Sequence, residues 1–272
     1  MELDKIKQVE LDILKTTVAI LDRHDIPYFI SYGTCIGAIR HNGFIPWDDD
    51  IDISLFRKDY ENARVILQKE LPEHYIYCDR FTEEEFPYNF GKVRRKNTAF
   101  VHGGDAHLNI SHGIYIDIFP LDDCYDSLAD NERLINKIKR LRMLVDLKRM
   151  SYKKYGRLRP IWHLPLIFFA HAFVNCKSVQ DKIDKLCKSV EAPSGKVCSF
   201  LTPYGTKDIY DKSWFGSGKK VLFEDDNFFV PENVEAYLTH IYGDYMQLPP
   251  VEKRVSHHDV VYSSTESEYH PQ

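Results

Sequence analysis

Apolar residues in the first quarter of the chain recur with the period of an α-helix and then with that of a β-strand. Residues 4–25 place isoleucine, leucine and valine three or four positions apart, which predicts an amphipathic helix that ends before Pro27. Residues 28–32 form a short apolar run typical of a buried strand, and residues 35–40 follow as a short helix. Within residues 50–55 polar side chains alternate with isoleucine and leucine, so a strand there has one polar and one apolar face.

The rest of the chain mixes the same two patterns. Further strands are predicted at 75–78, 89–101 (with a turn at Lys96-Asn97), 112–123 and 221–224, and further helices at 59–71, 130–155, 178–190 and 234–243. Asp130 and Ser178 are expected to cap helices, and Gly243 is expected to end the last one. This pattern predicts an α+β fold, in which a small mixed sheet is flanked by helices and the C-terminal part is helical. We expect one domain over residues 1–272, with its core in about 1–125 and a helical region in about 126–260.

Residues 161–174, IWHLPLIFFAHAFV, are strongly apolar. The segment is too short to span a bilayer, and His163, Pro165 and His171 interrupt it. A basic run precedes it, made of Lys148, Arg149, Lys153, Lys154, Arg157 and Arg159. Two interpretations remain open, a core helix and a segment that lies on an anionic membrane surface.

Four aspartates lie within five positions just where the fourth predicted element, the strand at residues 50–55, begins: Asp48, Asp49, Asp50 and Asp52. On a strand, Asp50 and Asp52 share a face, and two such carboxylates repel each other unless a proton or a cation neutralises them. Mg²⁺ prefers oxygen ligands of this kind, together with substrate phosphates. Two aspartates in an Asp-X-Asp pattern, without other site residues, are also common on solvated surfaces that bind no metal. An EF-hand loop starting at Asp48 is excluded, because its sixth position is Ile53 rather than glycine.

Gly33 and Thr34 stand between the first strand and the short helix. A small-residue turn at a helix N-terminus offers free backbone N–H groups and the positive end of the helix dipole, which suit a phosphate. A phosphate-binding turn followed by paired aspartates is typical of metal-assisted phosphoryl or nucleotidyl transfer.

Two later strands add charged candidates. Lys92 and Arg94 fall on one face of the predicted strand 89–101, where they are either exposed basic residues or groups that offset negative charge. Asp117 lies in the apolar run HGIYIDIFPLDD, where burying a carboxylate is costly unless it meets a cation or hydrogen-bond donors. Asp117 is therefore a candidate third carboxylate.

The run SYGTCIGAIRHNGFIPWDDDIDISLFRKDY, residues 31–60, resembles the signature of the LicD family of phosphorylcholine transferases, which is also similar to the fukutin-related proteins. Similar segments recur downstream, so the resemblance covers most of the chain. It implies a nucleotidyltransferase-like fold. It also implies transfer of a phospho-alcohol, phosphocholine foremost, from a CDP-linked donor to a hydroxyl of a cell-surface glycan or its lipid-linked precursor, with release of CMP.

The resemblance also implies roles for individual residues. Asp50, Asp52 and Asp117 are expected to hold Mg²⁺ (or Mn²⁺) on the diphosphate of the donor, and Asp117 is the candidate general base. The residues expected to bind the donor phosphates are Gly33, Thr34, Arg40, Lys92 and Arg94. Further residues expected near a ligand or substrate are Trp47, Asp48, Arg254 and His257.

Several alternatives stay open at this stage. The same carboxylates also serve a nucleotidyltransferase with an NTP donor or a sugar transferase, and a non-catalytic glycan- or membrane-binding module is a further option. The alcohol is not readable from the sequence. Choline requires an aromatic cage, for which the candidates are Tyr204, Trp214, Phe215 and Tyr242.

Composition limits the classes of partner and the cellular location that we expect for the protein. A formal net charge of −5 argues against a general nucleic-acid-binding protein. The six cysteines show no CxxC spacing, and residues 1–15 lack the apolar core of a signal peptide. We therefore expect a cytoplasmic protein with reduced thiols, and peripheral contact with the inner membrane surface is the further option.

Overall fold

The computed structural model describes residues 2–150, 153–154, 157–158, 161–191, 194–256 and 259–271. Its α-helices are α1 (Glu2–Arg23), α2 (Tyr32–His41), α3 (Arg57–Glu70), α4 (Leu128–Arg149), α5 (Leu164–Phe173), α6 (Cys176–Cys187) and α7 (Val234–Tyr242). Its short 3₁₀ helices are η1 (Ile161–His163), η2 (Gly205–Asp208), η3 (Lys212–Trp214) and η4 (Val251–Lys253). Its strands are β1 (Phe29–Ile30), β2 (Asp52–Phe56), β3 (Tyr75–Cys78), β4 (Gly91–Arg95), β5 (Ala99–His102), β6 (Tyr115–Asp123), β7 (Lys153–Lys154), β8 (Arg157–Leu158), β9 (Lys196–Cys198), β10 (Ile209–Asp211), β11 (Lys219–Phe223), β12 (Asp226–Val230) and β13 (Val260–Ser264).

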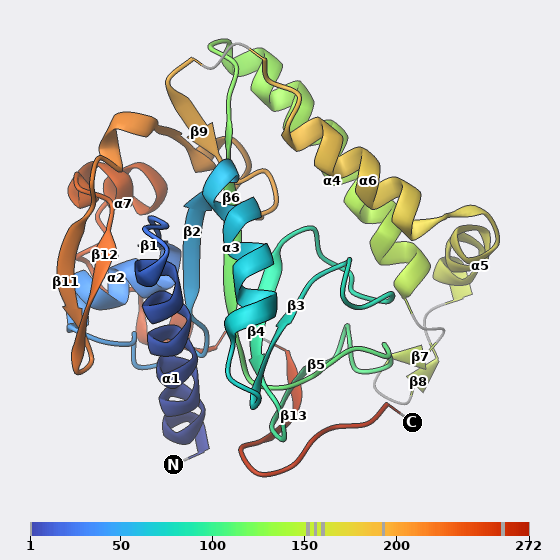
Figure 1. The fold of residues 1–272 in the computed structure, drawn as a ribbon. Helices are drawn as coiled ribbons and strands as arrows, with labels where there is room; N and C mark the ends of the chain where they lie inside the picture. Colours follow the sequence, from blue (N-terminus) through green and yellow to red (C-terminus); the bar gives the residue numbers. More distant parts are fainter. Residues whose placement is uncertain are drawn as a thin grey trace.

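A mixed sheet forms the centre of the molecule, with strand order β1-β2-β6-β4-β3 (Figure 1). β2 and β6 are parallel, whereas β1, β4 and β3 join the sheet in antiparallel pairs. β9 pairs with the end of β6 and carries β10. β6 is central and buried on both faces, which explains its nearly continuous apolar sequence. The predicted mixed sheet flanked by helices is confirmed.

Helices cover this sheet and pack against its apolar face. The stripe of α1 supplies fully buried side chains such as Ile13 and Leu14, which join Ile53 and Leu55 of β2 in one core. α3 lies beside α1 over β2 and β6, while α4 and α6 pack against each other farther along the chain (Figure 1). The period-3.6 and period-2 patterns therefore meet in the core as the sequence predicts.

Helix starts are where the structure departs most from the sequence-based boundaries. α2 begins at Tyr32, so β1 is only two residues long, and Tyr32 has a positive φ of 50°. Asp130 and Ser178 are not helix caps. The caps lie three residues earlier, where the side chains of Ser127 and Asn175 accept hydrogen bonds from the N–H groups of Asp130 and Ser178.

The predicted strand 89–101 is two strands, β4 and β5, joined by the expected turn at Lys96-Asn97, where Asn97 has a φ of 58°. The C-terminal part is less purely helical than expected. It also contains the β11–β12 hairpin, and β13 pairs with β5. Gly243 ends α7 with a positive φ, as predicted.

Residues 161–174 form η1 and α5, which stand at the edge of the molecule beside the end of α4 (Figure 1). Only Ile167 and Ala170 of α5 are buried. The core-helix interpretation of this segment is therefore wrong. Among the described residues, every helix is too short or too polar to cross a membrane.

Candidate active site

The register of the sheet places three charged residues side by side. Asp52 of β2 is paired with Asp117 of β6, and Asp117 is paired with Lys92 of β4. Paired residues on neighbouring strands point to the same face, so the three side chains form a row across the sheet. The Lys92 Nζ donates to Asp117 Oδ1 at 2.5 Å, and both side chains are largely buried.

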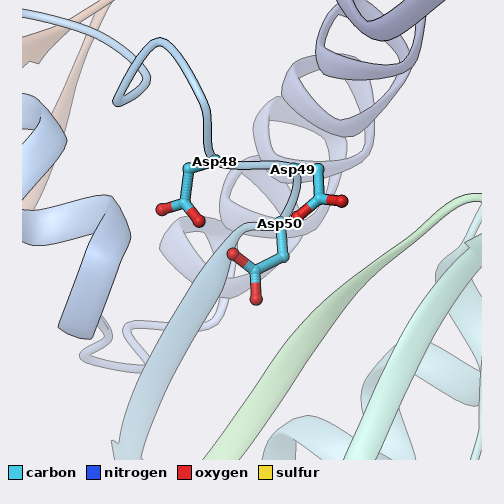
Figure 2. Close-up of side chains that lie close together, drawn as sticks. All are labelled: Asp48, Asp49 and Asp50. Atoms are coloured by element: carbon cyan, nitrogen blue, oxygen red, sulfur yellow. The ribbon is translucent and has the colours of Figure 1, made fainter. Parts of the chain in front are cut away.

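A second acidic group lies at the start of the same row. Figure 2 shows Asp48, Asp49 and Asp50 on the loop that leads into β2. One carboxylate oxygen from each of these residues lies within 4.8 Å of the others. Because β2 starts at Asp52, Asp50 belongs to this loop and not to the strand face on which it was predicted. Asp50 therefore groups with Asp48 and Asp49.

The two acidic groups interact electrostatically. Burial raises the pKa of Asp52 well above its usual range, and the charges of Asp50, Asp117 and Asp48 raise it further. Carboxylate oxygens suit a hard divalent cation as ligands, and such a cation would neutralise the repulsion between these aspartates. The residues present therefore fit Mg²⁺, and among the described residues the carboxylate oxygens that converge are those of Asp48, Asp49 and Asp50.

Gly33 and Thr34 lie inside the first turn of α2 rather than in a turn ahead of it. A Cβ atom on Gly33 would lie 2.6 Å from Asp48 Oδ2, so glycine leaves room for that carboxylate at the positive end of the helix. Thr34 Oγ1 accepts a hydrogen bond from the N–H of Asp52 at 2.9 Å. In this structure both residues position aspartates, and their contact with a phosphate stays a prediction.

Two arginines from distant parts of the sequence lie near each other and near Trp47, which precedes the acidic loop. Burial lowers the pKa of Arg40, and the nearby charge of Arg254 lowers it further. The guanidinium of Arg254 lies 5.6 Å from the centre of the Trp47 ring. Trp47 is the residue directly before Asp48. Arg40 Nη1 donates to the carbonyl of Tyr245, and Arg254 Nε to that of Pro249. The structure thus brings together the predicted residues Arg40, Trp47 and Arg254.

Another predicted residue, Arg94, makes contacts of its own on β4. Arg94 is buried, donates through Nη1 to the carbonyl of Gly113 at 2.9 Å and stacks over Tyr115, so it holds β6 against β4. His257 lies outside the described residues.

Two acidic residues at this site have no role assigned from the sequence, although Asp49 belongs to the aspartate cluster noted there. Asp49 is buried and accepts a hydrogen bond from Ser256 Oγ at 2.6 Å, which attaches the C-terminal segment to the acidic loop. Glu10 of α1 is fully buried, and burial raises its pKa well above the usual range, with Asp50, Asp49 and Asp48 adding to the effect. The pattern contains a signal for Glu10, because it lies four residues after Ile6 and four before Leu14, on the buried face of α1.

The aromatic candidates divide between two places. Tyr204 stacks on Tyr32 with 5.5 Å between ring centres, and its hydroxyl lies 3.0 Å from that of Tyr242. Burial raises the pKa of Tyr204 to about 12, and Asp52 and Asp50 are among the charges that contribute. Trp214 instead packs on His240, and Phe215 lies in the core. Tyr204 and Tyr242 are therefore the pair near the carboxylates.

Comparison with known proteins places this site in a family. The family model described as LicD/FKTN/FKRP, nucleotidyltransferase domain, matches residues 25–143, which include both acidic groups and Lys92. The lipopolysaccharide cholinephosphotransferase LicD of Haemophilus influenzae is 30% identical over 254 residues, which cover 91% of this chain and 92% of that protein. The chain belongs to the LicD family.

Other relatives match a shorter part of the chain. The human ribitol-5-phosphate transferase FKTN is 31% identical over 55 residues, 20% of this chain and 12% of that protein. An uncharacterized protein of Rickettsia prowazekii, RP689, is 41% identical over 61 residues, 22% of this chain and 21% of that protein. Membership of the LicD family identifies the chain as a transferase with a nucleotidyltransferase-like domain, as the sequence predicted.

Proposed function

We propose that this LicD-family protein transfers phosphocholine from CDP-choline to a hydroxyl group of a cell-surface glycan or its lipid-linked precursor, with release of CMP. The observation that supports this most is that Arg254, with Arg40 near it, lies over Trp47, which directly precedes the converging carboxylates of Asp48, Asp49 and Asp50. A diphosphate needs both cationic side chains and a divalent cation held by carboxylates. The phosphocholine named for the Haemophilus influenzae relative supports the choice of alcohol.

In the proposed reaction, Asp50, Asp52 and Asp117 would hold Mg²⁺, and this ion would supply Lewis-acid stabilisation of the negative charge on the transferred phosphate. Arg40 and Arg254 bind the diphosphate and offset the charge that develops on the leaving CMP. The acceptor hydroxyl forms a bond to the phosphorus that carries choline while the bond to the CMP oxygen breaks. The hydroxyl proton moves to the Asp117 carboxylate, which Lys92 holds in position.

Detection of the released nucleotide tests this proposal. Purified protein is incubated with CDP-choline, CDP-ribitol, CDP-glycerol or CDP-ethanolamine, with Mg²⁺ or with EDTA, and with an oligosaccharide or lipid-linked acceptor. We expect CMP only with metal, and fastest from CDP-choline. Release of pyrophosphate from CTP or another NTP without CMP from any CDP-alcohol would instead identify a nucleotidyltransferase.

Arg254→Ala is expected to raise the KM for CDP-choline by about 10- to 100-fold, because one charge-assisted contact with the diphosphate is lost. The matched control is Lys253→Ala, which removes an exposed cation one position earlier. Initial rates over a range of donor concentrations measure the effect. Equal KM values for the two variants would show that Arg254 does not contribute to binding of the donor.

Tyr204→Leu, combined with Tyr242→Leu, is expected to lower kcat/KM for CDP-choline by about 10-fold or more, because leucine has no ring face for the quaternary ammonium. The same variant should change kcat/KM for CDP-ribitol or CDP-glycerol by less, since neither alcohol has a cation. Competition between two donors in one reaction measures this ratio directly. An unchanged ratio would place the choline group elsewhere.

A further inference from the structure

The surface of η1 and α5 is unusual for an exposed part of a protein. Six large apolar side chains between residues 161 and 173 are 55–80% exposed: Ile161, Trp162, Leu166, Phe168, Phe169 and Phe173. We call this set the aromatic face. Isolated exposed apolar residues are ordinary, but a contiguous group of this kind marks an interaction surface.

The aromatic face is ordered by helical geometry. Ile167 and Ala170 are buried and hold α5 beside α4. Leu166, Phe169 and Phe173 follow one another at intervals of three and four residues, so they share one side of the helix. The rings of Phe169 and Phe173 lie 4.9 Å apart. These three side chains therefore form a continuous apolar strip along α5.

Positive charge surrounds this strip in the sequence. Residues 147–180 contain seven lysine and arginine residues and no aspartate or glutamate, although the whole chain has a formal net charge of −5. Lys148 Nζ donates to the carbonyl of His171 at 2.5 Å, which joins the basic end of α4 to α5. The β7–β8 hairpin, which contains Lys153, Lys154 and Arg157, connects the two helices. The exposed apolar strip thus lies within a segment of the chain whose charged residues are all positive.

We propose that the aromatic face docks on the surface of an anionic phospholipid bilayer. A helix of this type lies in the plane of the interface, with its apolar side among the acyl chains and basic residues at the headgroups. A second copy of the chain fits less well, because a symmetric contact would bring two segments of the same positive charge together. The proposal does not depend on the transfer reaction, and its test measures binding alone.

Flotation with vesicles tests the docking. The full chain is expected to float with phosphatidylglycerol vesicles, and weakly or not at all with phosphatidylcholine vesicles or in 1 M salt. The variant Phe169→Ser with Phe173→Ser should bind at least about tenfold more weakly, because two exposed rings that would enter the bilayer are removed. The matched control, Val65→Ser with Leu222→Ser, removes two exposed apolar side chains from α3 and β11 and should bind as the wild type does.

A spectroscopic measurement does not rely on the double variant. Trp162 is 74% exposed, so its fluorescence should shift to the blue and be quenched by brominated phosphatidylglycerol, and Trp162→Phe should lose that response. Absence of flotation, equal binding to neutral vesicles, or unchanged binding by the Phe169→Ser, Phe173→Ser variant would overturn the proposal. A concentration-dependent dimer without lipid that is lost in the same variant would assign the face to a second copy.

Discussion

Replacing Asp50 with asparagine should lower metal-dependent CMP release by about 1000-fold or more. Asp50 lies in the converging group with Asp48 and Asp49, and its negative charge also raises the pKa of Asp52. Asparagine keeps the size of the side chain but removes the negative charge that a divalent cation requires. The rate at saturating CDP-choline, measured over a range of Mg²⁺ concentrations, tests this expectation.

The control for this variant is Asp126→Asn, which changes a 91% exposed carboxylate far along the chain in the same chemical way. The control should keep the rate and the Mg²⁺ dependence of the wild type. If Asp50→Asn kept its rate within a few-fold, the metal assignment would be wrong. If high Mg²⁺ restored the rate of Asp50→Asn, the residue would contribute to metal affinity rather than to the chemical step.

Local patterns predicted the parts of this site that lie on one element. The alternation in residues 50–55 and 112–123 identified the polar positions of β2 and β6, and parallel pairing then put Asp52 beside Asp117. Asp50 was placed wrongly on the strand because periodicity does not reveal where pairing begins. The start of β2 depends on a hydrogen bond from the Asp52 N–H to Thr34, which comes from another element.

Such local patterns could not predict contacts between segments that are distant in the sequence. Arg40 and Arg254 were both named as candidates, yet nothing in their own neighbourhoods indicates that they meet. Their proximity arises because the C-terminal segment returns to the acidic loop, where Ser256 donates to Asp49. Gly33 shows the converse case. Its small size was interpreted as room for a phosphate, whereas in the structure it leaves room for Asp48.

The two buried ion pairs of β6 offer a way to separate stability from metal binding. Asp117 is paired with Lys92 at the active-site row, and Asp122 is paired with Arg57 through two short contacts of 2.6 and 2.7 Å near the far end of the strand. Removing one partner from such a pair leaves a buried charge without compensation. Lys92→Met and Arg57→Met should therefore each lower the free energy of unfolding by about 3–5 kcal/mol without metal.

The two variants should respond differently to Mg²⁺. In Lys92→Met the Asp117 carboxylate is no longer held by an amine, so a bound cation can compensate it and should recover a large part of the lost stability. In the part of the chain that the structure describes, no converging group of metal-ligating side chains includes Asp122, so Arg57→Met should gain no more from Mg²⁺ than the wild type. Thermal unfolding with EDTA and with a Mg²⁺ series measures both. Equal gains in the two variants would show that Asp117 is not a metal ligand, while a loss of CMP release in Lys92→Met alone would confirm that its amine orients Asp117 for the proton transfer.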